Sequence, residues 1–155
     1  MAIKPNSIWS WDITFLQTTV KGMFFYLYLI MDIYSRKIVG FDIFSEQLSE
    51  HASEVIAESC KSENVERMQL TLHSDNGSPM KGSTMLATLQ KLGITPLFSR
   101  ASVSNDNSYS ESLFKTLKYC PEYPAKPFDT IEQAKAWVTK FVYWYNITFI
   151  VELNL

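Results

Sequence analysis

The chain has 155 residues, 46% hydrophobic and 19% charged, which fits one globular domain with a substantial core. Its formal net charge of −2 lacks the basic balance that is typical of a free-standing DNA-binding domain. The apolar run at 23–31 is too short to cross a bilayer, and no secretory signal pattern opens the chain, so we expect a cytoplasmic protein outside the membrane. Cys60 and Cys120 lack metal-ligand spacing, and we expect both to be reduced thiols.

Three strand-like segments come first. They are rich in β-branched and aromatic residues, are joined by short turns, and lie at 8–16, 23–31 and 38–44. This pattern favours three antiparallel strands in sequence order.

Beyond residue 45 the hydrophobic pattern alternates between helix and strand. The spacing predicts a helix over 49–62, a strand over 68–73, a helix over 82–92 that ends at Gly93, and a strand over 94–98. Residues 99–110 are polar and without an apolar period, which predicts a mobile loop. Helices follow at 109–118 and, capped by Asp129 or Thr130, at 131–145. The order of elements predicts an α/β fold with a five-stranded mixed sheet and helices on both faces.

Three carboxylates stand at distinctive points of these elements. Asp12 interrupts the apolar first strand, Asp75 follows the fourth strand in His-Ser-Asp-Asn-Gly, and Glu111 lies in the first turn of a helix. Positions 76–110, 35 residues, separate the last two. A buried, unpaired carboxylate at Asp12 would be costly. Asp75 alone could form a turn, and Glu111 alone could be a surface acid that compensates the helix dipole.

Five motifs in order give the chain a resemblance to a known family. They are Trp-Asp-Ile-Thr, Met-Asp-Ile-Tyr-Ser-Arg-Lys-Ile-Val-Gly, His-Ser-Asp-Asn-Gly-Ser, Ser-Asn-Asp-Asn-Ser-Tyr-Ser-Glu-Ser-Leu-Phe-Lys-Thr-Leu-Lys and Tyr-Trp-Tyr-Asn. From about Ile8 to about Asn146 the chain resembles the catalytic core of DDE transposases and retroviral-type integrases, and among them the orfB type of bacterial insertion-sequence transposases. The resemblance implies an RNase H-like fold with one acid on the central strand, one just after the fourth strand and one on a nearby helix.

The resemblance also implies that Asp12, Asp75 and Glu111 are the catalytic and metal-binding residues. Two-metal phosphoryl transfer needs hard oxygen ligands that hold two ions roughly 3.5–4 Å apart. Mg²⁺ accepts one or two carboxylates together with substrate phosphate oxygens. We therefore expect Mg²⁺ or Mn²⁺ in a two-metal site that DNA phosphates complete, with Asp12 bridging the ions, Asp75 completing one site and Glu111 the other.

Other polar residues near the acids are interpreted as structural. Asp32 is expected to form a turn or an ion pair with Arg36, and Asp106 to be a polar group of the loop. His73 is expected to be structural or to support the site rather than to act as a base. His51, at a helix start, is expected to face solvent.

Lys115 and Lys118 follow Glu111 on the same helix face. The resemblance implies that both lysines contact DNA phosphates, and the alternative is the solvated face of an amphipathic helix. Three residues of the polar loop suit phosphate or base-edge contacts: Arg100, Asn105 and Asn107. We interpret that loop as ordered by substrate, with a disordered connector as the alternative.

The core is expected at 1–146. The stretch 147–155 is hydrophobic, whereas the family is expected to continue with a basic sequence. We interpret it as a truncated or frameshifted end or as a fragment boundary. Only eleven residues precede Asp12, so the helix-turn-helix module that recognises element ends is expected on a separate segment or protein. The aromatic residues of the last helix are too dense for one face, so some should pack on the sheet and some form a subunit contact: Trp137, Phe141, Tyr143, Trp144 and Tyr145. We expect a homo-oligomer by analogy.

These observations predict the catalytic core of a DDE transposase or integrase. Such a divalent-metal-dependent polynucleotidyl transferase cuts DNA at element ends and joins them to target DNA through attack of a 3′-hydroxyl. One alternative is an RNase H-like nuclease acting on RNA in hybrids. Another is an inactive transposase remnant that only self-associates through its aromatic helix and apolar tail.

Overall fold

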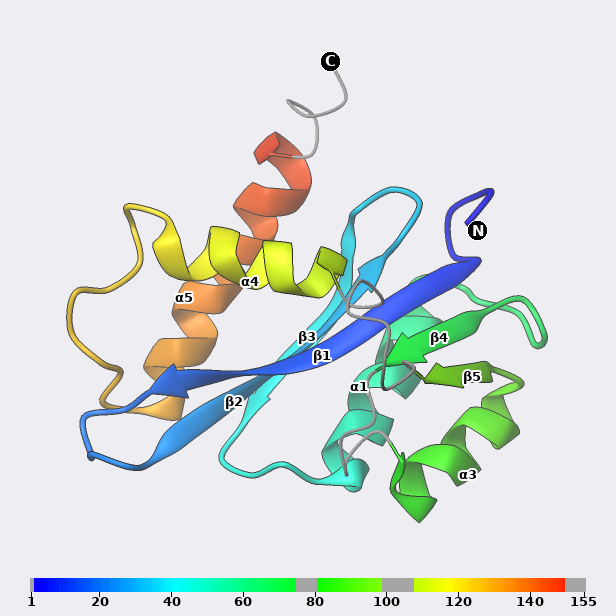
Figure 1. The fold of residues 1–155 in the computed structure, drawn as a ribbon, viewed down its shortest axis with the longest axis horizontal. Helices are drawn as coiled ribbons and strands as arrows, with labels where there is room; N and C mark the ends of the chain where they lie inside the picture. Colours follow the sequence, from blue (N-terminus) through cyan, green and yellow to red (C-terminus); the bar gives the residue numbers. More distant parts are fainter. Residues whose placement is uncertain (1, 75–80, 99–107, 150–155) are drawn as a thin grey trace.

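Five strands form one mixed sheet. The computed structural model describes residues 2–74, 81–98 and 108–149. The strands are β1 (Ile8–Gln17), β2 (Phe24–Asp32), β3 (Ile38–Phe44), β4 (Thr71–Ser74) and β5 (Thr95–Phe98). Their order is β3-β2-β1-β4-β5, with antiparallel pairing from β1 to β3 and parallel pairing of β1, β4 and β5 (Figure 1). The predicted five-stranded mixed sheet is therefore confirmed.

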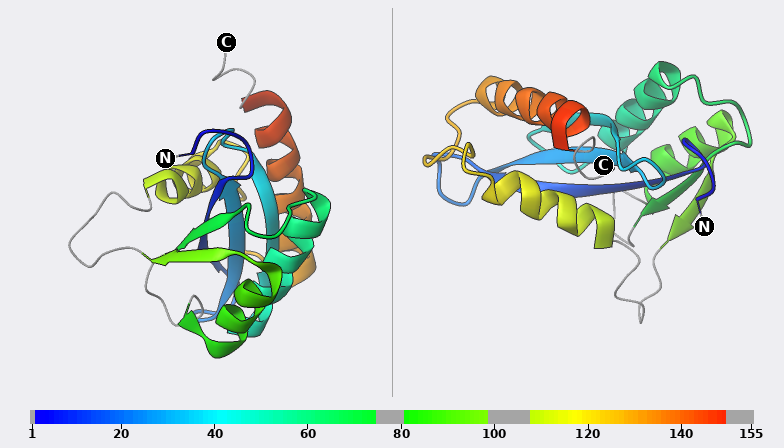
Figure 2. Two further views of the ribbon diagram at one scale, coloured as in Figure 1. Left: turned by 90° about the vertical axis from the view of Figure 1, so that its right-hand side faces the viewer. Right: turned by 90° about the horizontal axis from the view of Figure 1, so that it is seen from above.

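Helices cover both faces of this sheet, as predicted. They are α1 (Ser49–Ser62), α3 (Ser83–Leu92), α4 (Ser108–Tyr119) and α5 (Ile131–Trp144), followed by a short π-helix, η1 (Tyr145–Phe149). Seen from above, α4 lies on one side of the sheet and α1 and α3 on the other (Figure 2). Two predicted end signals are present: Gly93 takes a φ of 72° after α3, and Thr130 accepts a hydrogen bond from the Gln133 N–H at the start of α5.

Alternating side chains of β1 and β2 divide the core into two parts. On one face Trp11 packs in a cluster with Ile56 of α1 and Leu89 of α3. On the other face Leu16 packs in a cluster with Leu117 of α4 and Val138 of α5. The central strands are thus buried on both sides, and they hold the polar residues between their apolar neighbours at fixed positions.

The fourth strand begins later than the sequence predicts. It starts at Thr71 rather than Met68. Met68 has a φ of 66°, which strands do not use, and its N–H donates a hydrogen bond to the carbonyl of Gly93 at 2.9 Å. An apolar residue therefore occupies a turn here. The last helix differs at its other end, where α geometry stops at Trp144 and gives way to the π-helix.

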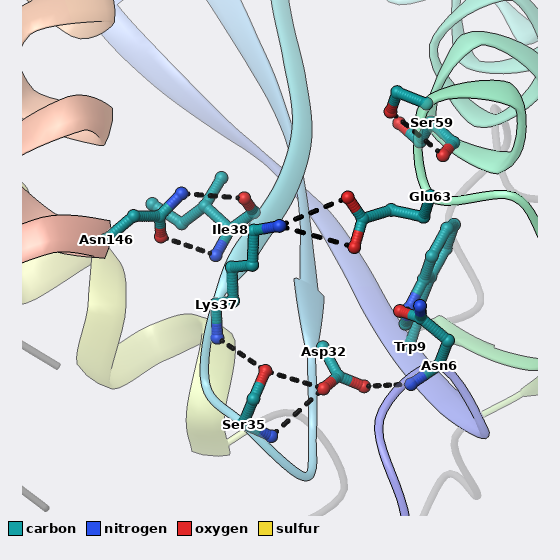
Figure 3. Close-up of polar contacts among 10 residues, drawn as sticks. Asn6, Trp9, Asp32, Ser35, Lys37, Ile38, Ser59, Glu63 and Asn146 are labelled. Atoms are coloured by element: carbon teal, nitrogen blue, oxygen red, sulfur yellow. Dashed lines mark hydrogen bonds and ion pairs between the residues drawn. The ribbon is translucent and has the colours of Figure 1, made fainter.

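Asp32 organises the turn between β2 and β3 (Figure 3). Its buried carboxylate accepts hydrogen bonds from the Asn6 N–H at 3.1 Å, the Ser35 N–H at 3.0 Å and the Ser35 hydroxyl at 2.6 Å. Of the two roles predicted for Asp32, the structural turn is the one observed. The guanidinium of Arg36 lies instead over the ring of Tyr109.

His51 is packed more closely than the sequence predicts. Its ring stacks on that of Phe44, with the centroids 3.9 Å apart and the planes inclined by 7°. The prediction of a solvent-facing residue was wrong, because the aromatic residue at the end of β3 lies beside the first turn of α1 and offers the imidazole an apolar surface.

Both cysteines are free thiols, in keeping with the sequence prediction. Burial raises the pKa of the Cys60 thiol to about 11, because the thiolate would lose its hydration on the buried face of α1. In the part of the chain that the structure describes, every helix is too short or too polar to cross a bilayer.

Candidate active site

Asp12 lies where β1 and β4 separate. β4 pairs only with the start of β1, ending at Ser10 opposite His73, while β2 follows β1 to its end. Beyond the separation, the Ile13 N–H donates a hydrogen bond to the Asp12 carboxylate at 2.8 Å. Asp12 is half-buried, so its side chain is not sealed in the core.

The first turn of α4 is fixed against the same strand. The hydroxyl oxygens of Ser10 and Ser110 lie 3.2 Å apart, and both side chains are buried. Residues two apart in a strand share a face, so Ser10 and Asp12 both face α4. Glu111 follows Ser110 directly and is exposed. The structure therefore brings two of the three predicted acids, Asp12 and Glu111, to one region of the surface.

The third acid lies outside the described residues, and so does the polar loop. The loop residues in question are Arg100, Asn105, Asp106 and Asn107. β4 ends at Ser74, the residue before Asp75 in the chain. Ser10 and His73 are partners in the parallel register of β1 and β4. In the sequence, Asp12 comes two positions after Ser10, and Asp75 comes two positions after His73. The roles of Asp75 and the loop residues stay predictions.

The described acids fit part of a metal site. Within residues 2–74, 81–98 and 108–149, no group of three His, Cys, Asp or Glu residues could hold a metal ion by itself. Asp12 and Glu111 supply carboxylate oxygens, the donors that Mg²⁺ and Mn²⁺ prefer, and both side chains reach solvent. A site for these ions would need at least one further oxygen donor, from the protein or from a bound phosphate.

The two predicted DNA-contacting lysines lie along α4. Lys115 is exposed, whereas Lys118 is half-buried, and burial lowers the pKa of Lys118. Lys118 lines a surface cavity of about 510 Å³ whose walls include Phe15 and Lys126. With a helix rise of 1.5 Å per residue, Lys118 stands about 10 Å along α4 from Glu111. DNA contact by either lysine stays a prediction.

One contact beside the site was missed by sequence reasoning. The guanidinium carbon of Arg36 lies 3.6 Å from the ring centroid of Tyr109, which is the second residue of α4 and precedes Glu111 by two positions. Arg36 and Tyr109 both lie in the motifs that suggested the family, but no local pattern links two residues so far apart in the chain. His73, by contrast, is buried in β4, in keeping with the structural role predicted for it.

The sheet order, with an acid on its central strand and another on a helix packed against that strand, defines an RNase H-like integrase core. Three solved structures share this fold. The structural similarity has a TM-score of 0.65 to the catalytic core domain of BIV integrase, at 16% identity and covering 92% of this chain and 85% of that one. It is 0.61 to the HTLV-2 integrase core in complex with magnesium, at 16% identity over 94% of this chain and 87% of that one. It is 0.72 to a chain of the simian T-cell lymphotropic virus intasome, at 17% identity over 93% of this chain and 49% of that one.

The chain belongs to the Integrase core domain family, which matches residues 2–103. It is 33% identical over 117 residues to the transposase of insertion sequence IS904 from Lactococcus lactis, covering 76% of this chain and 45% of that protein. It is 25% identical over 146 residues to a putative transposase of IS986/IS6110 from Mycobacterium tuberculosis, covering 92% of this chain and 52% of that protein. The chain thus spans about half the length of the curated relatives it matches. The resemblance to insertion-sequence transposases is confirmed.

Proposed function

We propose that this chain is the catalytic core for DNA strand cleavage and strand transfer in transposition. One observation carries the proposal: the buried hydrogen bond between Ser10 and Ser110 sets the helix of Glu111 against the strand of Asp12, in a chain of the Integrase core domain family. The proposed substrate is DNA at element ends, whose 3′-hydroxyl then attacks a phosphate of target DNA.

In this proposal Asp12, Asp75 and Glu111 hold two Mg²⁺ or Mn²⁺ ions, and DNA phosphate oxygens complete the site. A pair of such ions supplies activation of the attacking oxygen and stabilisation of charge on the departing one. The protein's own contribution is placement, since β1 fixes Asp12 and α4 carries Glu111. The magnesium complex of the similarly folded HTLV-2 integrase core supports the choice of ion.

Contacts with DNA and with other chains are also proposed. Lys115 and Lys118 would neutralise phosphates, and the loop residues Arg100, Asn105 and Asn107 would add polar contacts. The net charge of −2 suits a core whose DNA is gripped mainly by a separate helix-turn-helix segment or protein. By analogy with transposases of bacteria such as Lactococcus lactis, we also propose a homo-oligomer that acts in the cytoplasm.

The test is a strand-transfer assay with Asp12→Asn, Asp75→Asn and Glu111→Gln. Each substitution keeps the shape of the side chain and removes the charge that holds the ion. We expect each rate to fall by about 10²-fold to 10³-fold, with thermal unfolding midpoints close to that of the wild type, because loss of preorganised charge stabilisation costs this much in other sites.

Glu132→Gln is the matched control, because Glu132 is an exposed acid in the first turn of α5, as Glu111 is in α4. It should leave the rate unchanged. An Asp75→Asn variant with the wild-type rate would overturn the three-acid assignment. Cleavage of an RNA–DNA hybrid in preference to duplex DNA would instead favour the RNase H-like alternative.

A further inference from the structure

We propose that Arg36 is a positioning residue for Glu111, an inference that rests on the proposed function. Its guanidinium lies over the Tyr109 ring at 3.6 Å, and it therefore holds the first turn of α4 from the side of the β2–β3 turn. Ser110, the next residue, is held from β1 through its hydrogen bond to Ser10. Two consecutive helix residues are thus anchored from different elements immediately before the acid.

The turn that carries Arg36 is itself well fixed (Figure 3). Asp32 ties it to the N-terminal segment through the Asn6 N–H. On the other side, the Asn146 side chain accepts a hydrogen bond from the Ile38 N–H at 2.9 Å and donates one to the Ile38 carbonyl at 3.0 Å. The charge of Arg36 also acts on Tyr145, opposing the rise in the Tyr145 pKa that burial causes. Arg36 therefore projects from a rigid support toward α4.

Arg36 has two features that should lower the stability of the fold. Its φ is 68°, a backbone conformation that residues with a side chain rarely adopt. Its Nη1 atom is buried with no hydrogen-bond partner in the part of the chain that the structure describes. Backbone strain and unsatisfied polar groups of this kind gather at functional sites, where position is kept at the expense of stability. Both costs occur here in a residue that contacts the helix of Glu111.

The test compares Arg36→Gly with Met68→Gly. Both substitutions place glycine at a similar positive φ, 68° and 66°, but Met68 is an exposed residue of the turn before β4. We expect Arg36→Gly to keep or raise the thermal midpoint, to lower kcat of strand transfer about 10-fold to 100-fold with little change in KM for DNA, and to raise the Mn²⁺ concentration for half-maximal rate. A misplacement of about 1 Å has effects of this size. Met68→Gly should keep the wild-type kcat and metal dependence.

Two further variants separate positioning from bulk stability. Arg36→Lys keeps a cation over the ring and should stay within about 3-fold of the wild-type rate. Tyr109→Leu should lower kcat as much as Arg36→Gly does. The double variant Arg36→Gly with Tyr109→Leu should lower kcat no further. A wild-type kcat and metal dependence in Arg36→Gly, or equal losses in Arg36→Lys and Arg36→Gly, would overturn the proposal.

Backbone hydrogen exchange of peptides covering 108–119 gives a readout that does not require activity. Exchange in the first turn of α4 should be faster in Arg36→Gly and unchanged in Met68→Gly. Unchanged exchange in Arg36→Gly would also overturn the positioning role. A wild-type protein without strand transfer, but with the expected exchange difference, would refute the proposed function and leave the anchoring of α4 by Arg36 standing.

Discussion

Two buried titratable residues, Asp32 and Cys60, show how single side chains support this fold away from the proposed site. Asp32 is a carboxylate only 1% exposed, and its oxygens accept hydrogen bonds from the turn and the N-terminal segment. Cys60 is a buried thiol of α1 whose ionised form is disfavoured by loss of hydration. The oxygens of the carboxylate are thus satisfied by hydrogen-bond donors, while burial disfavours ionisation of the thiol.

Replacement of Asp32 by alanine should lower the free energy of unfolding by about 3 kcal/mol, because three donors lose their acceptor. Two of these donors are backbone N–H groups, those of Asn6 and Ser35, and the third is the Ser35 hydroxyl. Denaturant titration measures the change. Asp42→Ala is the control, since Asp42 is a half-exposed acid of β3 that pairs with Lys135 and accepts only the Ile43 N–H among the described backbone donors, and its loss should cost less than about 1 kcal/mol. Equal losses in the two variants would contradict the structural role of Asp32.

The raised pKa of Cys60 predicts a loss of stability at alkaline pH. The unfolded thiol ionises near its ordinary pKa of 9.0 and the folded one near 11, so the folded state holds its proton longer. The contribution is complete below pH 9 and is lost as pH rises to about 11, by roughly 2–3 kcal/mol in all. Unfolding free energies measured across this range should fall less steeply for Cys60→Ala than for the wild type. Parallel slopes would count against the burial of this thiol.

The contact between β3 and α1 depends on the absence of a side chain at Gly40. A Cβ placed there would lie 2.9 Å from the Cβ of Ser59 in α1 and would overlap its hydroxyl. Ser59 also donates a hydrogen bond to the Val55 carbonyl at 2.7 Å, which holds the hydroxyl in place. The strand and the helix therefore meet nearly backbone to backbone at this point.

Gly40→Ala should lower the free energy of unfolding by about 2 kcal/mol, because α1 must move away from β3. Adding Ser59→Gly removes the obstructing atoms, so the double variant should be more stable than the sum of the single changes by about 1–2 kcal/mol. A double-mutant cycle by denaturant titration measures this coupling. Strict additivity would show that the two residues do not meet.

At the scale of the whole molecule, α5 and η1 divide the aromatic residues of the last helix between core and surface, and the predicted packing of some of them on the sheet is observed. Phe141 and Tyr145 are buried against the sheet, while Tyr143 is 70% exposed and Trp144 41% exposed. Ile147 adds a further exposed apolar side chain. An exposed apolar patch of this kind suits a contact with a second copy of the chain.

Tyr143→Ser combined with Trp144→Ser should therefore weaken self-association, measured by sedimentation over a range of protein concentrations. The control is Tyr119→Ser, because Tyr119 is 84% exposed at the end of α4 and lines a different surface cavity from Trp144. A dimer that persists in the double variant would place the subunit contact elsewhere. A monomer in the wild type would remove the homo-oligomer proposal altogether.

Sequence reasoning was strongest where local periodicity determines structure. The bounds of α1 and β3 were predicted to the residue, and Asp12 lies within β1, the strand in which it was predicted. The sheet order came from the resemblance, since periodicity does not fix which strands pair. The turn at Met68, the stacking of His51 and the Arg36–Tyr109 contact were missed, because each depends on a neighbour distant in the chain.

Within the part of the chain that the structure describes, β4 pairs with β1 only as far as Ser10, and this has a consequence for protein handling. Open strand edges invite pairing with other chains and so promote aggregation. Here the Asp12 carboxylate accepts the Ile13 N–H, and Phe128 pairs with the far end of the strand through its N–H to the Gln17 carbonyl. Asp12→Asn keeps an acceptor for that N–H, whereas Asp12→Ala releases it. Asp12→Asn is therefore the better substitution for testing the proposed catalytic role, and we expect Asp12→Ala to form intermolecular sheets more readily.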